Sequence, residues 1–115
     1  MTDSKVYNVR GAEVTVTANL YPRTIDIHIT VDLSNLDQGE PDHSPHQLIA
    51  YLMLPNYSTA SSYWWARTHR KVTCHTGAQA RRIVKHALAK IDDAIEAALV
   101  ARASRKQHLA DVFTD

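Results

Sequence analysis

The 115-residue sequence predicts a single α+β domain, in which an antiparallel sheet of about four strands is covered on one face by one long C-terminal helix. Two patterns support this prediction. Residues 13–33 alternate apolar and polar side chains with a period of two, which is typical of a half-buried β-hairpin. Residues 76–101 repeat apolar side chains with a helical period, which is typical of an amphipathic helix lying on a core.

The hairpin consists of two β-rich runs joined by a turn. Residues 14–20 alternate Val, Ala or Leu with Thr or Asn, and residues 25–33 alternate Ile, Val or Leu with Asp, His or Thr. Pro22 lies between the runs, where the chain is expected to turn. One face should contact the helix, and the Thr, Asp and His face should meet water or a partner. Residues 1–12, with a break at Gly11, are expected to form a partly ordered lead-in.

The middle of the chain predicts an acidic loop and two further strands. Residues 34–47 contain glycine, prolines and several acids, which indicates a loop. Residues 48–54 (LIAYLML) are apolar on both parities, which predicts a central strand covered on both faces, with a buried helical turn as the alternative. Residues 63–74 predict the last strand, and one parity of that strand mixes aromatic and basic residues.

The long helix has a marked start and an early exit from the core. Thr76 and Gln79 have the spacing of a capping box, so the helix should begin there. Arg102 falls in the middle of the apolar arc, so the helix should leave the core near residue 101. A short helical tail follows, and its apolar residues fall on the same side of the helix as the core residues. This tail is expected to fold back or to dock on a neighbouring subunit. Its partner-binding residues are Leu109, Val112 and Phe113.

Charge is unevenly distributed along the chain, although the net charge is only +1. Residues 1–62 hold three basic and seven acidic residues, whereas residues 63–115 hold ten basic and five acidic ones. Residues 67–90 contain seven basic residues and no acidic one. Such segregation is typical of a surface that binds nucleic acid or phosphate. Alternatively, the acidic loop covers the basic strand, within one molecule or between two.

The strongest binding hypothesis joins the last strand to the helix start. Free amides at residues 76–79, a glycine that lets a ligand approach, and nearby cations together suit a phosphate group. Aromatic residues of the strand could stack on bases. The alternative is an ordinary solvated face. The candidate phosphate-binding residues are Arg67, His69, Lys71, Gly77, Arg81, Arg82 and Lys85, and the candidate stacking residues are Tyr63 and Trp65.

Residues 77–89 (GAQARRIVKHALA) resemble the last strand-to-helix junction of double-stranded-RNA-binding domains. In that family a small-residue loop leads into a helix that starts with two basic residues and has a third one three positions later. The resemblance implies that Arg81, Arg82 and Lys85 contact phosphates across a major groove. The arm-binding domains of phage integrases, three strands followed by a helix, are similarly close.

Other chemistries lack a matching pattern, so we expect no enzyme, metal or cofactor. A zinc site from His43, His46, Cys74 and His75 lacks a Cys-x-x-Cys pair. The spacing from Cys74 to Arg81 is one residue too long for a phosphatase loop, and neighbouring carboxylates on a helix do not share a face. Most of the seven histidines are expected at the surface or in turns.

Cysteine content and hydropathy suggest a location. A single cysteine cannot form an internal disulfide, no signal peptide is visible, and the longest apolar run is too short to span a bilayer. We therefore expect a cytoplasmic protein of a bacterium or a phage-infected cell, without a membrane partner. The leading function is a non-enzymatic module that holds nucleic-acid backbone or another polyanion. The alternative is a protein-interaction protein, either a homo-oligomeric assembly subunit or a phage-encoded inhibitor of a host protein.

Overall fold

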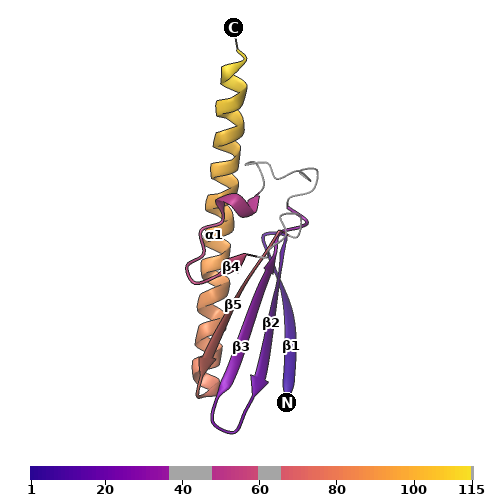
Figure 1. The fold of residues 1–115 in the computed structure, drawn as a ribbon, viewed down its shortest axis with the longest axis vertical. Coiled ribbons are helices and arrows are strands. Elements are labelled where there is room, and N and C mark those ends of the chain that lie inside the picture. The colour runs from indigo at the N-terminus through magenta and orange to yellow at the C-terminus, as the bar shows by residue number, and fades with distance from the viewer. Residues whose placement is uncertain (37–47, 60–65, 115) are drawn as a thin grey trace.

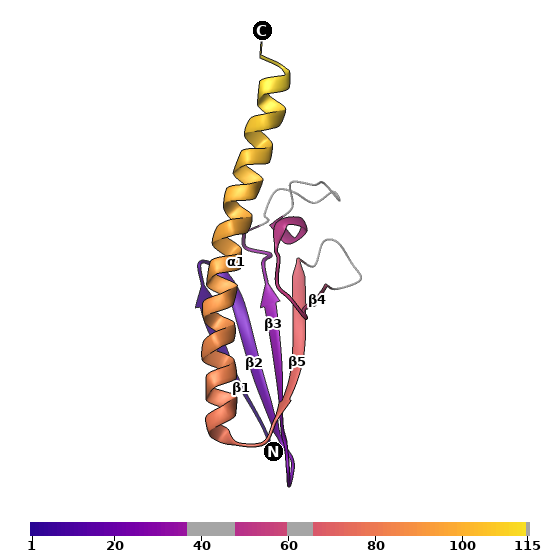
Figure 2. The same cartoon turned by 90° about the vertical axis from the view of Figure 1, so that its left-hand side faces the viewer.

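The computed structural model describes residues 1–36, 48–59 and 66–114 and confirms the α+β fold (Figure 1). Its antiparallel sheet has the strand order β1-β2-β3-β5-β4, and the long helix α1 lies on one face (Figure 2). The molecule is elongated, with extents of 66 × 23 × 21 Å. In chain order the elements are β1 (Thr2–Val9), β2 (Ala12–Leu20), β3 (Ile25–Asp32), the 3₁₀-helix η1 (Leu48–Tyr51), β4 (Ser58–Thr59), β5 (Arg67–Cys74) and α1 (Gly77–Val112).

The predicted hairpin is formed by β2 and β3. Val14 pairs with Val31 and Val16 with Ile29 across the two strands, and these four side chains are buried. The amide of Tyr21 donates a hydrogen bond of 2.9 Å to the carbonyl of Thr24, which closes the predicted turn. The apolar parity of the hairpin forms the centre of the core, as the alternation indicated.

The prediction that residues 1–12 are a partly ordered lead-in is wrong, because residues 2–9 form the edge strand β1. This strand pairs with β2 along its whole length. Arg10 and Gly11 both have positive φ, 51° and 89°, as a two-residue type I′ hairpin turn requires. The side-chain oxygen of Asn8 accepts a hydrogen bond of 3.0 Å from the amide of Gly11. The strand was missed because its edge position leaves most of its side chains exposed and polar.

The predicted central strand at residues 48–54 is also wrong. Leu48–Tyr51 is a 3₁₀-helix, which was the alternative for this segment, and residues 52–54 follow without regular structure. Leu48 is fully buried, and Leu52 and Leu54 pack against the core. The segment is apolar on both parities because η1 lies against α1 near one end of the sheet (Figure 1).

The helix begins as predicted. The Thr76 hydroxyl accepts a hydrogen bond of 3.1 Å from the Gln79 amide, and the Gln79 side chain accepts one of 3.2 Å from the Thr76 amide. These bonds complete a capping box. One side of α1 then enters the core through four fully or nearly fully buried residues. These are Ala87, Ile91, Ile95 and Ala98.

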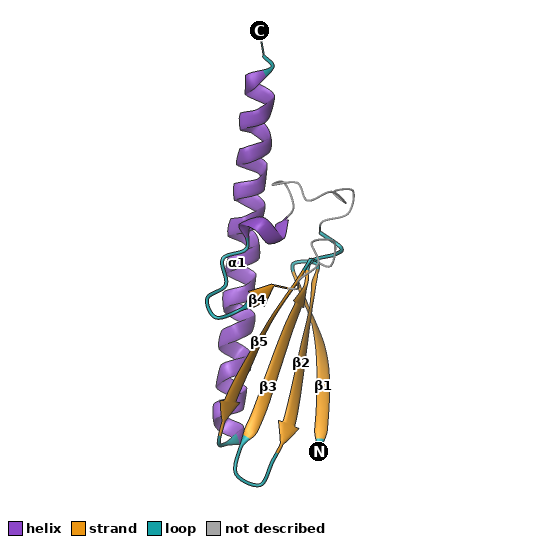
Figure 3. Ribbon diagram, viewed as in Figure 1, coloured by secondary structure: helices purple, strands orange, loops and turns teal. Residues whose placement is uncertain are grey.

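The helix leaves the core where Arg102 indicated, but it does not fold back. The Arg102 Nη1 atom donates a hydrogen bond of 3.2 Å to the carbonyl of Leu36, which lies four residues after the end of β3. Beyond this contact α1 continues without a break and projects past the sheet (Figure 3). We call residues 103–114 the overhang. The predicted short tail is therefore the last part of one 36-residue helix.

Candidate functional site

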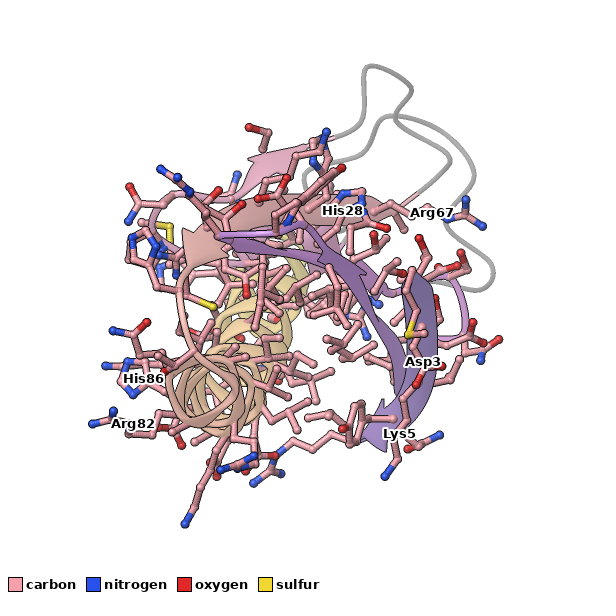
Figure 4. The ribbon with its side chains drawn as sticks, turned by 90° about the horizontal axis from the view of Figure 1, so that it is seen from below. Asp3, Lys5, His28, Arg67, Arg82 and His86 are labelled. Carbon is pink, nitrogen blue, oxygen red and sulfur yellow. The ribbon has the colours of Figure 1, made fainter. Side chains whose placement is uncertain are left out.

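The basic residues of β5 lie on the sheet face that turns away from α1, which we call the open face. Arg67, His69 and Lys71 are exposed, whereas Thr68 and Cys74, on the other parity, are buried. His28 of β3 also lies on the open face, on the opposite side of the sheet from the helix (Figure 4). The described open-face residues of β3 and β5 are Asp26, His28, Thr30, Asp32, Arg67, His69, Lys71 and Thr73.

The charges of the open face are partly paired within the sheet. Arg67 Nε donates a hydrogen bond of 3.1 Å to Asp32 Oδ2, and the Thr73 hydroxyl donates one of 3.0 Å to Asp26. The rings of His28 and His69 meet edge to face, with their centroids 5.6 Å apart. The open face therefore combines the acids of β3 with the basic residues of β5, and it does not form a purely basic surface.

Two pKa shifts accompany this pairing. Burial of Asp32 raises the pKa of its carboxyl, but hydrogen bonds from Ser34 and the nearby Arg67 outweigh that effect and hold the pKa below its ordinary value. Burial lowers the pKa of His28, and Lys71 and His69 lower it further. At neutral pH the face therefore carries an ionised Asp32 and a neutral His28.

The helix-start cations lie on the other side of the sheet. Arg81, Arg82 and Lys85 are exposed, and Figure 4 shows Arg82 and His86 pointing away from the sheet. The sheet therefore separates them from Arg67, His69 and Lys71. The structure divides the expected strand-and-helix-start surface into two separate surfaces.

The helix terminus offers fewer free amides than expected. The capping box engages the amides of Thr76 and Gln79, and the His75 amide also donates to the Gln79 side chain at 2.9 Å. Gly77 is exposed, and a Cβ placed on it would be 3.7 Å from Arg81 Nη1, an ordinary contact distance. An anion on this side would therefore depend on side chains more than on the helix terminus.

The exposed side of α1 is basic over its first four turns. We call Arg81, Arg82, Lys85, His86 and Lys90 the basic helix face; all five are exposed. The first acidic residue of the helix is Asp92, which forms an ion pair of 2.5 Å with Arg10. Among the described residues, the three cations Arg81, Arg82 and Lys85 have no ion-pair partner.

A pocket of about 600 Å³ opens beside this face, between α1 and the segment before β4. We call it the strand-side pocket. Arg70 of β5 and His86 and Lys90 of α1 line it together with one acid, Asp93. Tyr57 also lines it, and burial raises the pKa of this phenol although Arg70 opposes the shift. Arg70 is not among the binding residues predicted from the sequence, because it lies on the parity of β5 that faces the helix.

A second opening, which we call the side groove, lies between the other flank of α1 and β1–β3. It encloses about 450 Å³. Its floor is apolar, and Arg81 and Lys85 are the charged residues that line it. The apolar lining residues are Tyr7, Val16, Ala18, Ile27, Ala80, Val84 and Leu88.

The residues predicted to stack on bases, and those considered as zinc ligands, do not come together in the described structure. Tyr63, Trp65, His43 and His46 lie outside the described residues, as does most of the acidic loop. Cys74 is buried at the end of β5, whereas His75 is exposed. Within the described ranges, no group of three or more His, Cys, Asp or Glu residues could hold a metal ion.

The predicted partner-binding residues lie in the overhang. Val112 and Phe113 are 70% and 84% exposed, and Leu109 is half-buried. The part of α1 that carries them projects past the sheet (Figure 1). They are the apolar residues of α1 that lie farthest from the core.

Comparisons with protein families, curated proteins and solved structures found no match for this chain. Among the described helices, none is both long and apolar enough to cross a membrane.

Proposed function

We propose that this protein is a non-enzymatic binding module that holds nucleic-acid backbone, or a similar polyanion, on the basic helix face and the strand-side pocket. One observation carries the proposal. Arg70 from β5 lines one pocket together with His86 and Lys90 from α1, which lie 16 and 20 positions further along the chain. A phosphate group in this pocket would meet cations from two elements.

The local charge favours an anionic ligand. Arg81, Arg82 and Lys85 lie near the positive end of the helix dipole, where each cation costs a few tenths of a kcal/mol to about 1 kcal/mol. The described residues supply no acidic partner that offsets this cost. A row of phosphates along the helix would supply one, and binding would release counterions from the nucleic acid.

The test is a fluorescence-anisotropy titration with labelled RNA and DNA duplexes and single strands, from low to moderate salt. We expect Arg82→Ala with Lys90→Ala to weaken binding and to reduce the slope of log K against log salt by about two, since each lost phosphate contact removes about one unit. Arg67→Ala is the matched control, because Arg67 is a paired cation of the open face. It should leave binding nearly unchanged.

Two results would contradict the proposal. One is the absence of binding to any of these nucleic acids at low salt. The other is a loss of binding in Arg67→Ala that equals the loss in the double variant, since that would move the site to the open face.

The overhang supports a second function, protein–protein interaction. Most helical stability in proteins comes from packing of an apolar face, and the overhang lies past the described sheet. The overhang nevertheless presents Val112 and Phe113 to solvent. We propose that these residues contact another protein chain, as expected of an assembly subunit or an inhibitor.

A further inference from the structure

The outer edge of the sheet at β1 keeps backbone groups that the fold does not pair. Among the described residues β1 pairs only with β2, and its register is continuous from Thr2 to Val9, without a bulge (Figure 1). Such an edge is a template for a further strand, and proteins commonly block it with a very short strand, a bulge or a proline. Residues 2–9 form an eight-residue strand that has none of these three features. The β1 edge is therefore open to pairing with another extended chain.

The pairing with β2 determines which backbone groups of β1 point outward. In an antiparallel strand, successive residues direct both backbone groups alternately to one side and to the other. The Met1 carbonyl accepts a hydrogen bond of 2.8 Å from the Leu20 amide, so the odd-numbered residues bond to β2. The even-numbered residues, among them Ser4 and Val6, therefore direct their backbone groups outward. The Ser4 amide accordingly donates to the side chain of its neighbour Asp3, at 2.9 Å.

Two charged side chains of β1 restrict what a partner strand can be. Asp3 and Lys5 are exposed and lie two positions apart, on the same side of the strand (Figure 4). Lys5 Nζ lies 5.1 Å from the centre of the Tyr7 ring, and within the described part of the chain neither charge forms an ion pair. Because like charges directly opposite destabilise a strand pair, the partner needs a base facing Asp3 and an acid facing Lys5. An antiparallel copy of β1 supplies both.

Only one register of two antiparallel β1 strands brings these opposite charges together. Backbone bonding requires even-numbered residues to face even-numbered ones. When Ser4 faces Ser4, Asp3 of each copy faces Lys5 of the other, and Val6 faces Thr2. The two neighbouring registers that backbone bonding allows place Asp3 opposite Asp3, or Lys5 opposite Lys5. The charges of β1 therefore make the strand complementary to itself in a single alignment.

We propose that two copies of this chain associate through their β1 edges, as antiparallel strands with Ser4 facing Ser4, in a two-fold symmetric dimer. The inference is independent of both functions proposed above, because it uses neither the basic helix face nor the overhang. Two-fold symmetry makes the contact reciprocal, so the assembly closes as a dimer. Each Ser4 amide exchanges the Asp3 carboxylate for the Ser4 carbonyl of the other copy, and Asp3 turns to Lys5 of that copy. The two five-stranded sheets become one, with both α1 helices on the same face.

The first test is sedimentation equilibrium of the purified full chain over a range of concentrations. We expect a reversible dimer. Val6→Pro should raise its dissociation constant about 30-fold, since it removes two intermolecular hydrogen bonds that are each worth about fivefold. The Val6 amide points outward, so proline removes no bond between β1 and β2. Val6→Thr is the matched control, because it keeps the amide and a β-branched side chain, and it should dimerise like the wild type.

A charge exchange tests the register and the identity of the partner. Asp3→Lys and Lys5→Asp should each raise the dissociation constant about tenfold, because each variant places like charges opposite one another at two positions. An equimolar mixture of the two variants should form a heterodimer of nearly wild-type affinity, because every acid then faces a base again. A mixture that associates no more tightly than the separate variants would overturn the proposed register.

Other outcomes separate the β1 edge from other contacts. A chain that is monomeric at every concentration would overturn the dimer and leave both proposed functions intact. A dimer that Phe113→Asp dissociates, but that Val6→Pro leaves unchanged, would move the contact to the overhang and overturn the inference. Circular dichroism checks that each variant is folded. If Val6→Pro is unfolded, the mixture of charge variants decides, because Asp3 and Lys5 are exposed and their substitution leaves the core intact.

Discussion

The two faces of the sheet are made by the same strands and have opposite chemistry. On the helix side, Ile27, Ile29 and Val31 of β3 are at most 1% exposed. On the open side, the residues between them, His28 and Thr30, remain partly exposed. The difference follows from what covers each face, since α1 lies on one side and no described element lies on the other (Figure 2).

This comparison shows which surface still lacks a partner. The open face satisfies many of its own polar groups through pairs such as Arg67 with Asp32 and Ser4 with Thr17. The helix side instead carries unpaired cations, an apolar groove and an exposed helix end. We therefore assign the candidate functional surface to the side of α1, where the molecule leaves charge and apolar area unsatisfied.

The largest expected effect on stability appears when two adjacent residues of β3, one on each face of the sheet, are substituted. Ile29→Ala should lower the free energy of unfolding by about 3 kcal/mol, because it leaves a cavity in the core. Thr30→Ala, one residue along the same strand, should lower it by less than about 1 kcal/mol. Denaturant unfolding of both variants measures the difference. Equal losses would mean that the open face is covered as completely as the helix side.

A smaller loss of stability is expected when Asp32, the paired acid of the open face, is substituted. Asp32→Asn should cost about 1 kcal/mol at pH 7, since it weakens hydrogen bonds with Ser34 and Arg67. The pKa of Asp32 is lowered in the folded protein, so its stabilising effect is present above the unfolded value near pH 4 and is lost as the pH falls through the folded value. Denaturant unfolding between pH 7 and pH 2.5 should show a shallower acid loss in the variant.

The smallest expected effect is the pH dependence of stability that His28 contributes. Its pKa is lowered by burial and by Lys71 and His69, so the folded protein favours the neutral ring. The stabilisation is complete above the unfolded value near pH 6.5 and is lost as the pH falls through the folded value. Thermal unfolding at pH 7.5 and 5.5 should show this decline, and His28→Asn should reduce it.

His108→Asn provides the control for that pH effect. His108 is an exposed residue of the overhang, far from the open face. The variant should keep the wild-type decline between the two pH values. A decline that disappears in His108→Asn, but persists in His28→Asn, would assign the proton uptake to the overhang.

The sequence predicted the elements whose own pattern is strong. The alternation in residues 14–33 and the capping box at Thr76 each depend on near neighbours, and the structure contains both. Strand β1 has a weak pattern, because an edge strand buries few side chains and so selects few apolar residues. Residues 48–54 are apolar on both parities, and such a run does not distinguish a strand from a buried turn.

The candidate site could be predicted only in part. Arg81, Arg82 and Lys85 were recognised as a cluster because they are close together in the sequence. Their separation from Arg67, His69 and Lys71 depends on which face of the sheet the helix covers, and alternation alone does not determine that. Arg70 was missed for the same reason, since its role requires β5 and α1 to meet at one pocket.

The sequence by itself therefore determined the periodic elements, their start and turn signals, and the exit of α1 from the core at Arg102. These features follow from local backbone preferences and from the period of the apolar side chains. Only the tertiary structure decided which cations share a surface, where the side groove opens, and how far the overhang extends past the sheet. Those properties depend on how the helix lies across the sheet, which is fixed by packing between residues that are distant in the sequence.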